Sequence, residues 1–201
     1  PAIGLYESNM IYAQSKNILL IPGIEQTVCG KHVIMLNVTK EAENIENFED
    51  LARYRAAHPE CLIMAPHPYY YGNYSLKGFL DKHHDLFDAV EQSWFYNKIM
   101  NRNPEAKGAA EKYNLPFIAT SDTHKLKYLN NSYALIEASE LSPAAVFAAI
   151  RARKFKNESV PALFWRDMFC GPILEVFRHP IRSFYANKRW FIEVAKRRMH
   201  S

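Results

Sequence analysis

The segment Leu62-Ile63-Met64-Ala65-Pro66-His67-Pro68 is the most informative in the chain, because a short apolar run ends there at a histidine held between two prolines. Similar runs alternate along the chain with longer amphipathic stretches, which is the pattern of parallel strands joined by helical crossovers. The predicted strands are Ile18–Ile21, Val33–Val38, Leu62–Ala65, Ala89–Gln92, Phe117–Thr120 and Tyr133–Glu137. The predicted helices are Gly4–Ser15, Ile45–Ala57, Leu76–Lys82, Pro104–Tyr113 and Pro143–Arg153, the last with Ser142 as its N-cap. The predicted fold class is therefore α/β.

Length and composition limit the class of protein. A chain of 201 residues with 48% apolar content can bury a full core in one domain, or in one domain with an appendage. Its three cysteines, Cys29, Cys61 and Cys170, encode neither a disulfide framework nor a CxxC zinc site. No apolar run approaches the roughly 20 residues that span a bilayer, and no secretory leader pattern opens the sequence. We therefore expect a cytoplasmic protein.

The charge of the chain is unevenly distributed. Residues 161–201 hold eight Lys/Arg against three Asp/Glu, whereas residues 1–160 hold the remaining 17 against 18, so the net charge of +4 comes from the tail. The main body, residues 1–160, therefore has no electrostatic signature of a specific nucleic-acid partner. Residues 161–201 are predicted to form an aromatic and basic helical extension. It either packs on the outside of the main domain or contacts an acidic partner or an anionic membrane surface.

Acidic and histidine side chains follow several of the predicted strands. Glu25 follows the strand ending at Ile21, His67 follows Ala65, and Asp122 and His124 follow Thr120, whereas His32 immediately precedes its strand. In parallel α/β folds the loops at the carboxyl ends of the strands converge on one face. Carboxylates and imidazoles gathered there suit zinc, manganese or iron in a hydrolytic site. The sequence therefore predicts a divalent metal centre.

The order of these motifs matches a known family. Gly-Ile-Glu25 with His32, then His67-Pro68, then Ser-Asp122-Thr-His124 resembles the later metal motifs of the polymerase and histidinol phosphatase (PHP) family, over about residues 1–155. The resemblance implies a distorted (β/α)7 barrel that holds up to three divalent metal ions. It also implies hydrolysis of a phosphate ester on a small metabolite or nucleotide, with metal ions activating a bound water.

The resemblance also implies a role for each residue. Glu25 would bridge two metal ions, and His32 and His67 would complete the coordination of the second. Asp122 would bind the first ion and His124 the third, and these two residues are also the catalytic candidates, with His124 a general acid if it is not a ligand. Purely structural roles are the alternatives to metal binding. Glu25 could be a surface carboxylate at a turn, His32 could cap a strand, and Ser-Asp122 could be a helix-capping dipeptide.

Two motifs of the family do not occur in the sequence. PHP proteins begin with a His-x-His strand end and a Thr-Asp-His turn, and neither is present, so we expect a domain that is incomplete at its N-terminus. Two of three metal positions would then be incomplete. This favours an alternative in which a degenerate PHP module binds or scaffolds without catalysis. An amidohydrolase barrel is a third reading, although no candidate for its mid-barrel lysine is evident.

Other side chains lie near the predicted site. Tyr69-Tyr70-Tyr71 and Tyr74 follow His67-Pro68 and would line its mouth, with aromatic packing favoured over stacking on a substrate ring. Glu91 ends its strand on the same face, where core packing and a hydrogen bond to a metal ligand explain it equally well. Lys125 and Lys127 are expected to be solvated rather than bound to phosphate. Metal identity and oligomeric state do not follow from the sequence.

Overall fold

The computed structural model describes residues 2–123 and 129–162, without the side chains of residues 2–5. The chain divides after Pro161 into two units, and the elements below belong to the first unit, Pro1–Pro161. The predictions for His124, Lys125 and Lys127, and for nearly all of the extension 161–201, lie outside the described residues.

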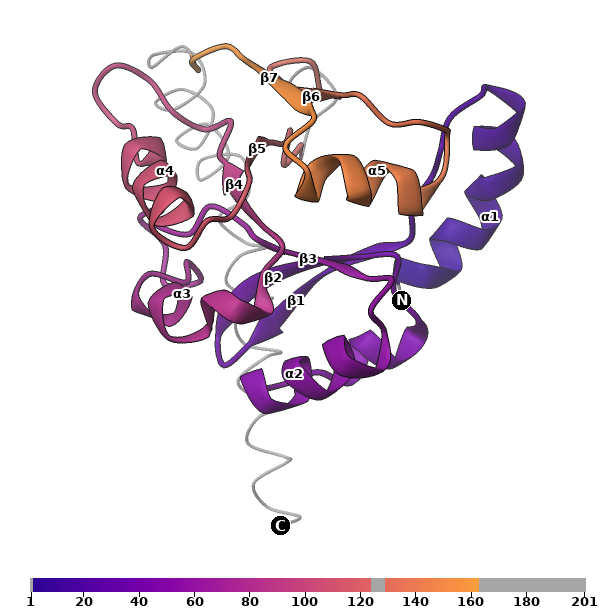
Figure 1. Ribbon diagram of the computed structural model, residues 1–201, viewed down its shortest axis with the longest axis horizontal. Coiled ribbons are helices and arrows are strands. Elements are labelled where there is room, and N and C mark those ends of the chain that lie inside the picture. The colour runs from indigo at the N-terminus through magenta and orange to yellow at the C-terminus, as the bar shows by residue number, and fades with distance from the viewer. Residues whose placement is uncertain (1, 124–128, 163–201) are drawn as a thin grey trace, which may run out of the picture. The chain divides into compact units, whose positions relative to one another are not determined.

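The centre of the first unit is a mixed five-stranded sheet in the order β1 to β5 (Figure 1). Its first three strands pair antiparallel, and β3, β4 and β5 pair parallel. The α/β class is thus confirmed, whereas the described residues form an open sheet and no closed barrel. The strands are β1 (Gly23–Val28), β2 (Lys31–Leu36), β3 (Leu62–Ala65), β4 (Ala89–Gln92) and β5 (Phe117–Ala119).

The first strand lies later in the chain than its apolar content suggested. The predicted strand Ile18–Ile21 is wrong, because those residues form no strand, and Ile18 is 54% exposed. Strand β1 instead forms a hairpin with β2 through the two-residue turn Cys29-Gly30. Both turn residues have positive φ angles, 48° and 74°, as a type I′ turn requires. This turn sets the register of the hairpin.

Two of the helices begin at side chains that cap them. Helix α2 starts at Phe48 and not at the predicted Ile45, because Asn47 accepts a hydrogen bond from the Asp50 amide. Ser142 caps the last helix as predicted, by accepting a hydrogen bond from the Ala145 amide. The helices are α1 (Ala2–Ser15), α2 (Phe48–Ala57), α3 (Gly78–His83), α4 (Asn103–Lys112) and α5 (Pro143–Arg151), with short 3-10 turns at Lys40–Asn44 and His84–Leu86. Within the described residues, no helix is both long and apolar enough to cross a membrane.

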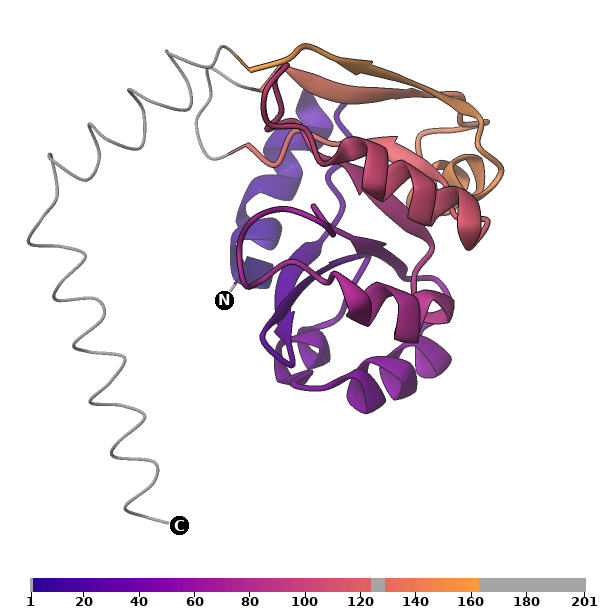
Figure 2. The same ribbon diagram turned by 90° about the vertical axis from the view of Figure 1, so that its left-hand side faces the viewer.

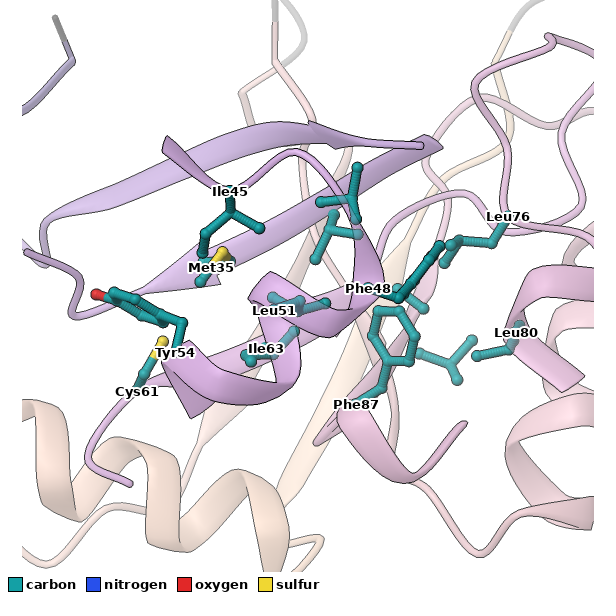
Figure 3. Close-up of a cluster of buried hydrophobic side chains, with 14 of the residues drawn as sticks. Met35, Ile45, Phe48, Leu51, Tyr54, Cys61, Ile63, Leu76, Leu80 and Phe87 are labelled. Atoms are coloured by element: carbon teal, nitrogen blue, oxygen red, sulfur yellow. The ribbon is translucent and has the colours of Figure 1, made fainter. Parts of the chain in front are cut away.

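One face of the sheet packs against α2, α3 and α4. Alternate residues of the strands, such as Met35 and Ile63, point into this core and are fully buried. Figure 3 shows Leu51 of α2 over Ile63, with Phe48 reaching toward Leu76. Each large apolar side chain buried in this way stabilises the fold by about 1.5–3 kcal/mol.

The other face packs against α5, which lies across the sheet from α2 (Figure 1). Phe147 and Ile150 of α5 contact the apolar side chains that alternate with the first set, among them Leu62 and Ile118. The central strand β3 is therefore buried on both faces. Because the strand periodicity is two, Glu91 lies on the same face as Ala89 and Ile118, at the carboxyl end of β4.

A two-stranded antiparallel sheet, β6 (Ser132–Ile136) and β7 (Phe155–Ser159), adjoins β5. It lies at the top of Figure 2, and α2 lies at the bottom. The side chain of Asn157 accepts a hydrogen bond from the Ala119 amide at 2.9 Å and donates one to the Phe117 carbonyl at 2.8 Å. Asn157 thus satisfies backbone groups at the edge of β5 and adds to the pairing of the polar segment 155–159 with β6.

Candidate metal centre

Two of the predicted ligands come from the β1–β2 hairpin. Glu25 pairs with Ile34 and His32 pairs with Thr27, so Glu25 and His32 are diagonal neighbours on one face of the hairpin. The prediction that Glu25 follows a strand and that His32 precedes one was therefore wrong, since both lie within strands. The pairing nevertheless explains why residues seven apart in sequence meet.

The third residue, His67, comes from the loop after β3. Its φ angle is 29°, in the left-handed region that a residue before proline rarely adopts. Pro66 and Pro68 stiffen the loop, and the His67 amide donates a 2.5 Å hydrogen bond to a carboxylate oxygen of Glu91. This conformation turns the imidazole toward the hairpin.

The three side chains meet at one point. The Glu25 Oε1 atom lies 3.1 Å from His32 Nδ1 and 3.5 Å from His67 Nε2, and one donor atom from each residue lies within 4.8 Å of the others. The distances match the roughly 3.3 Å that separates neighbouring ligand atoms around a tetrahedral zinc ion with bonds of about 2.0 Å. We call these residues the Glu25 trio.

The hydrogen-bonding state of the trio fits a cation. The Nδ1 atom of His32 is buried and forms no hydrogen bond, although it lies 3.1 Å from Glu25 Oε1, whereas His67 approaches Glu25 through its other ring nitrogen, Nε2. Lone pairs of neutral imidazoles and a carboxylate repel one another unless a proton or a metal ion lies between them. One carboxylate and two imidazoles are a donor set that zinc, manganese and iron accept.

Tyr74 supports the trio from outside. Its ring stacks on His32 with 4.7 Å between ring centroids, and its carbonyl accepts a 2.8 Å hydrogen bond from the His32 amide. The rings of His32 and His67 meet edge to face at 5.5 Å. Tyr74 therefore packs against the site, as the favoured reading of the tyrosine run expected.

Asp122 lies on the same edge of the sheet but outside the trio. It follows β5 and has a φ angle of 37°, a strained conformation for an aspartate. Its negative charge raises the pKa values of His67, Glu91 and Tyr70, so it lies near all three. The structure therefore brings Glu25, His32 and His67 together with Asp122 nearby, and the ligand roles stay predictions.

Electrostatics favour a positive charge at His67. Burial by itself would lower the pKa of the imidazole, but the contact with Glu25 and the charges of Glu91 and Asp122 outweigh it and raise the pKa above its ordinary value. Three carboxylates around one imidazole produce a site that attracts cations.

Glu91 connects two of the predicted metal-binding segments. Its carboxylate is 1% exposed, and it accepts hydrogen bonds from the His67 amide and from the Thr120 hydroxyl, two residues before Asp122. Burial raises the pKa of Glu91, and these hydrogen bonds oppose the rise. Of the two readings of Glu91, the contacts favour support of a predicted ligand over simple core packing.

Sequence reasoning missed Arg102, which lines a small pocket together with His67, Tyr70 and Glu91. Arg102 precedes α4 and is distant in sequence from every metal motif. The only local signal was an arginine directly before a helix that begins with Asn103 and Pro104.

Comparison with known proteins adds two findings. Residues 101–155 match the PHP-associated family, and no curated protein matches the chain. Among solved structures, the chain is similar to a two-domain protein from Bacteroides vulgatus that contains a predicted PHP-like metal-dependent phosphoesterase, with a TM-score of 0.59 and 18% identity over 77% of this chain and 48% of that one. It is also similar to PsfC from Pseudomonas syringae, with a TM-score of 0.52 and 15% identity over 82% of this chain and 66% of that one. At these identities the likeness concerns the fold, and the chain spans less than two thirds of either relative.

Proposed function

We propose that the chain is a protein of the PHP family that hydrolyses phosphate esters with the help of divalent metal ions; its motifs, the match of residues 101–155 and the similarity in fold support this. The observation that carries the proposal is the convergence of Glu25, His32 and His67 within 4.8 Å. The proposal includes a ligand role for Asp122 and for His124. It also includes the family's β/α barrel, of which the five-stranded sheet would form a part.

Each residue of the site would have a distinct role in binding the metal ion. Glu25 would supply a carboxylate, and His32 and His67 would bind through neutral imidazoles. A bound divalent ion supplies a water of lowered pKa and neutralises charge on the phosphoryl group. Glu91 would hold His67 in its strained conformation, and the Tyr74 ring would shield His32 from solvent.

The test is metal content and phosphate release in wild type and in His67→Ala. We expect purified wild type to hold zinc, manganese or iron and to release phosphate from a panel of small phosphate esters. His67→Ala should lose more than the roughly 10–100-fold in metal affinity that removal of an outer partner costs. Phosphate release should fall at least in proportion.

His58→Ala is the matched control. His58 also lies beside two carboxylates, with Glu60 at 3.2 Å and Glu41 at 3.4 Å, but it stands outside the Glu25 trio. The control should keep wild-type metal content and activity. A wild type without bound metal, or equal metal affinity in both variants, would refute the proposal. Bound metal without phosphate release would favour the non-catalytic module.

A further inference from the structure

A second hollow adjoins the pocket at His67. It is lined by Tyr69, Tyr70, Tyr71, Lys77, Arg102 and Glu105, and we call it the Arg102 groove. Three of these residues, Tyr69, Tyr70 and Arg102, also line the pocket that contains His67 and Glu91, so the two hollows lie side by side. The Arg102 groove therefore lies next to the pocket that His67 lines.

Arg102 is held in place but keeps free hydrogen-bonding capacity. Its guanidinium lies 4.7 Å from the centre of the Tyr71 ring, and one nitrogen donates to Glu105 at 2.6 Å. A guanidinium has five N–H donors in a rigid fork, and an exposed pair such as Arg102–Glu105 is weak enough to exchange partners. Arg102 is thus oriented by its neighbours and able to bind an anion.

Lys77 supplies a second positive charge at a position where its backbone is strained. Residues 76–79 form a turn closed by a 2.9 Å hydrogen bond from the Phe79 amide to the Leu76 carbonyl. Lys77 has φ 49° and ψ −125°, which is the first central position of a type II′ turn and favours glycine. Lys77 therefore occupies a position where a glycine would be less strained.

The groove therefore has an excess of positive charge. Lys77 and Arg102 stand against the single carboxylate of Glu105. Within residues 2–123 and 129–162, no carboxylate forms a salt bridge with the Lys77 ammonium. The Lys77 amide also donates a 2.8 Å hydrogen bond to the Pro68 carbonyl, which ties the lysine to the loop that carries His67.

A continuous row of aromatic contacts joins the groove to the trio. The rings of His67 and Tyr70 lie 6.4 Å apart, those of Tyr70 and Tyr71 lie 5.6 Å apart, and Arg102 covers Tyr71. The Glu25 trio and the Arg102 groove are therefore separated by little more than two aromatic side chains. A substrate that reaches both would carry its two anionic groups at opposite ends of the molecule.

We propose that the Arg102 groove binds a second anionic group of the substrate, so that the substrate is a phosphate ester that also carries a carboxylate or another phosphate. This inference rests on the proposed function, because it takes the ester phosphate to lie at the Glu25 trio. Lys77 and Arg102 act as specificity-determining residues. A guanidinium matches the planar, two-oxygen face of either group, and the lysine adds a point charge.

The test uses binding to metal-depleted protein, where no hydrolysis occurs. Two ligand pairs differ only in the second group: glycerol 3-phosphate with 3-phosphoglycerate, and fructose 6-phosphate with fructose 1,6-bisphosphate. Binding is followed by isothermal titration calorimetry and, in proteins that keep Arg102, also through the side-chain nitrogen resonances of Arg102. We expect at least one doubly anionic ligand to bind about fivefold or more tightly than its partner, and the preferred pair identifies the carboxylate or the phosphate. Equal affinities within both pairs, or no saturable change at Arg102, would overturn the inference.

Variants separate recognition from structure. Arg102→Gln and Lys77→Gly should each abolish the preference, whereas Lys107→Gln should keep it, because Lys107 pairs with Glu111 on α4 and does not line the groove. Lys77→Gly should also raise the melting temperature, since glycine relieves the turn, and a purely structural lysine would give no loss of preference. A retained preference in Arg102→Gln would refute the assignment. Preference without phosphate release from the metal-loaded protein would refute the proposed function alone.

Discussion

Replacement of Glu91 by alanine tests whether one buried carboxylate holds the candidate metal centre together. The change removes the acceptor of the His67 amide and of the Thr120 hydroxyl. A buried donor left without an acceptor costs about 1–3 kcal/mol. The Thr120 hydroxyl is only half-buried and can rotate toward water, so most of the loss comes from the His67 amide. We therefore expect Glu91→Ala to lower the free energy of unfolding by about 2–3 kcal/mol.

Glu91→Gln should be much milder. The amide has nearly the same volume, its carbonyl can accept from the His67 amide, and its NH2 group can donate to the Thr120 oxygen. Burial of the ionised carboxylate is itself unfavourable, as the raised pKa of Glu91 indicates, so loss of the charge offsets part of the cost. The free energy of unfolding should change by less than about 1 kcal/mol.

Metal affinity distinguishes this role from general stability. Glu91→Ala frees the His67 backbone from its strained conformation, so its metal affinity should fall by about 10–100-fold, as for other groups that orient a ligand. Urea unfolding gives the stability, and competition with a chromogenic chelator gives the affinity. Asp88→Asn is the control, because Asp88 is also buried but contacts Arg55 and Arg151 away from the trio. The reasoning fails if Glu91→Ala keeps wild-type affinity, or if Asp88→Asn loses as much.

Three further predictions concern the fold. Asp88 accepts hydrogen bonds from Arg55, the Ile63 amide and Arg151, so Asp88→Asn should destabilise the chain at pH 7 by about 2–4 kcal/mol in urea unfolding. Burial tends to raise the pKa of Asp88, but these donors outweigh it and lower the pKa. The stabilisation from Asp88 is therefore complete above the ordinary aspartate pKa and is lost as the pH falls through the lowered pKa. The stabilities of wild type and Asp88→Asn should consequently converge in acid. Phe147→Ala should lower the free energy of unfolding by about 3–5 kcal/mol, because the ring is 1% exposed between α5 and the sheet, and a loss under 1 kcal/mol would contradict this packing. Gly30→Ala should cost about 1–2 kcal/mol, because φ is 74° in the hairpin turn, and a neutral effect in thermal unfolding would contradict the turn type.

Sequence patterns located the buried strands well and the hairpin poorly. Strands β3 and β4 have the predicted bounds; β3 is a continuous apolar run, which gives a clear signal in a two-faced sheet, whereas in β4 only Ala89 and Val90 are apolar. Strand β1 was misplaced because the run Ile18–Ile21 is more apolar than Gly23–Val28, although Pro22 separates them. The turn glycine, Gly30, was a usable signal, but Cys29 before it is a rare partner at that position.

The direction of strand pairing also could not be read from periodicity. Parallel strands were expected throughout, and β1, β2 and β3 pair antiparallel, since apolar alternation is the same in both arrangements. Strand β7 was missed because its residues are mostly polar. It is held by antiparallel pairing with β6 and by contacts of Asn157 with β5, and both are distant in sequence.

The position of the Glu25 trio follows from the mixed pairing. Strand β3 has an antiparallel neighbour, β2, on one side and a parallel neighbour, β4, on the other. Its carboxyl-end loop therefore faces the β1–β2 hairpin, which supplies Glu25 and His32, and the end of β4, which supplies Glu91. Because two prolines and the Glu91 carboxylate already fix His67, a metal ion would meet donors in place and would not have to order a loop. Affinity at such a site depends on the residues that hold the ligands as much as on the ligands, and this dependence makes Glu91 the sharper test of the centre.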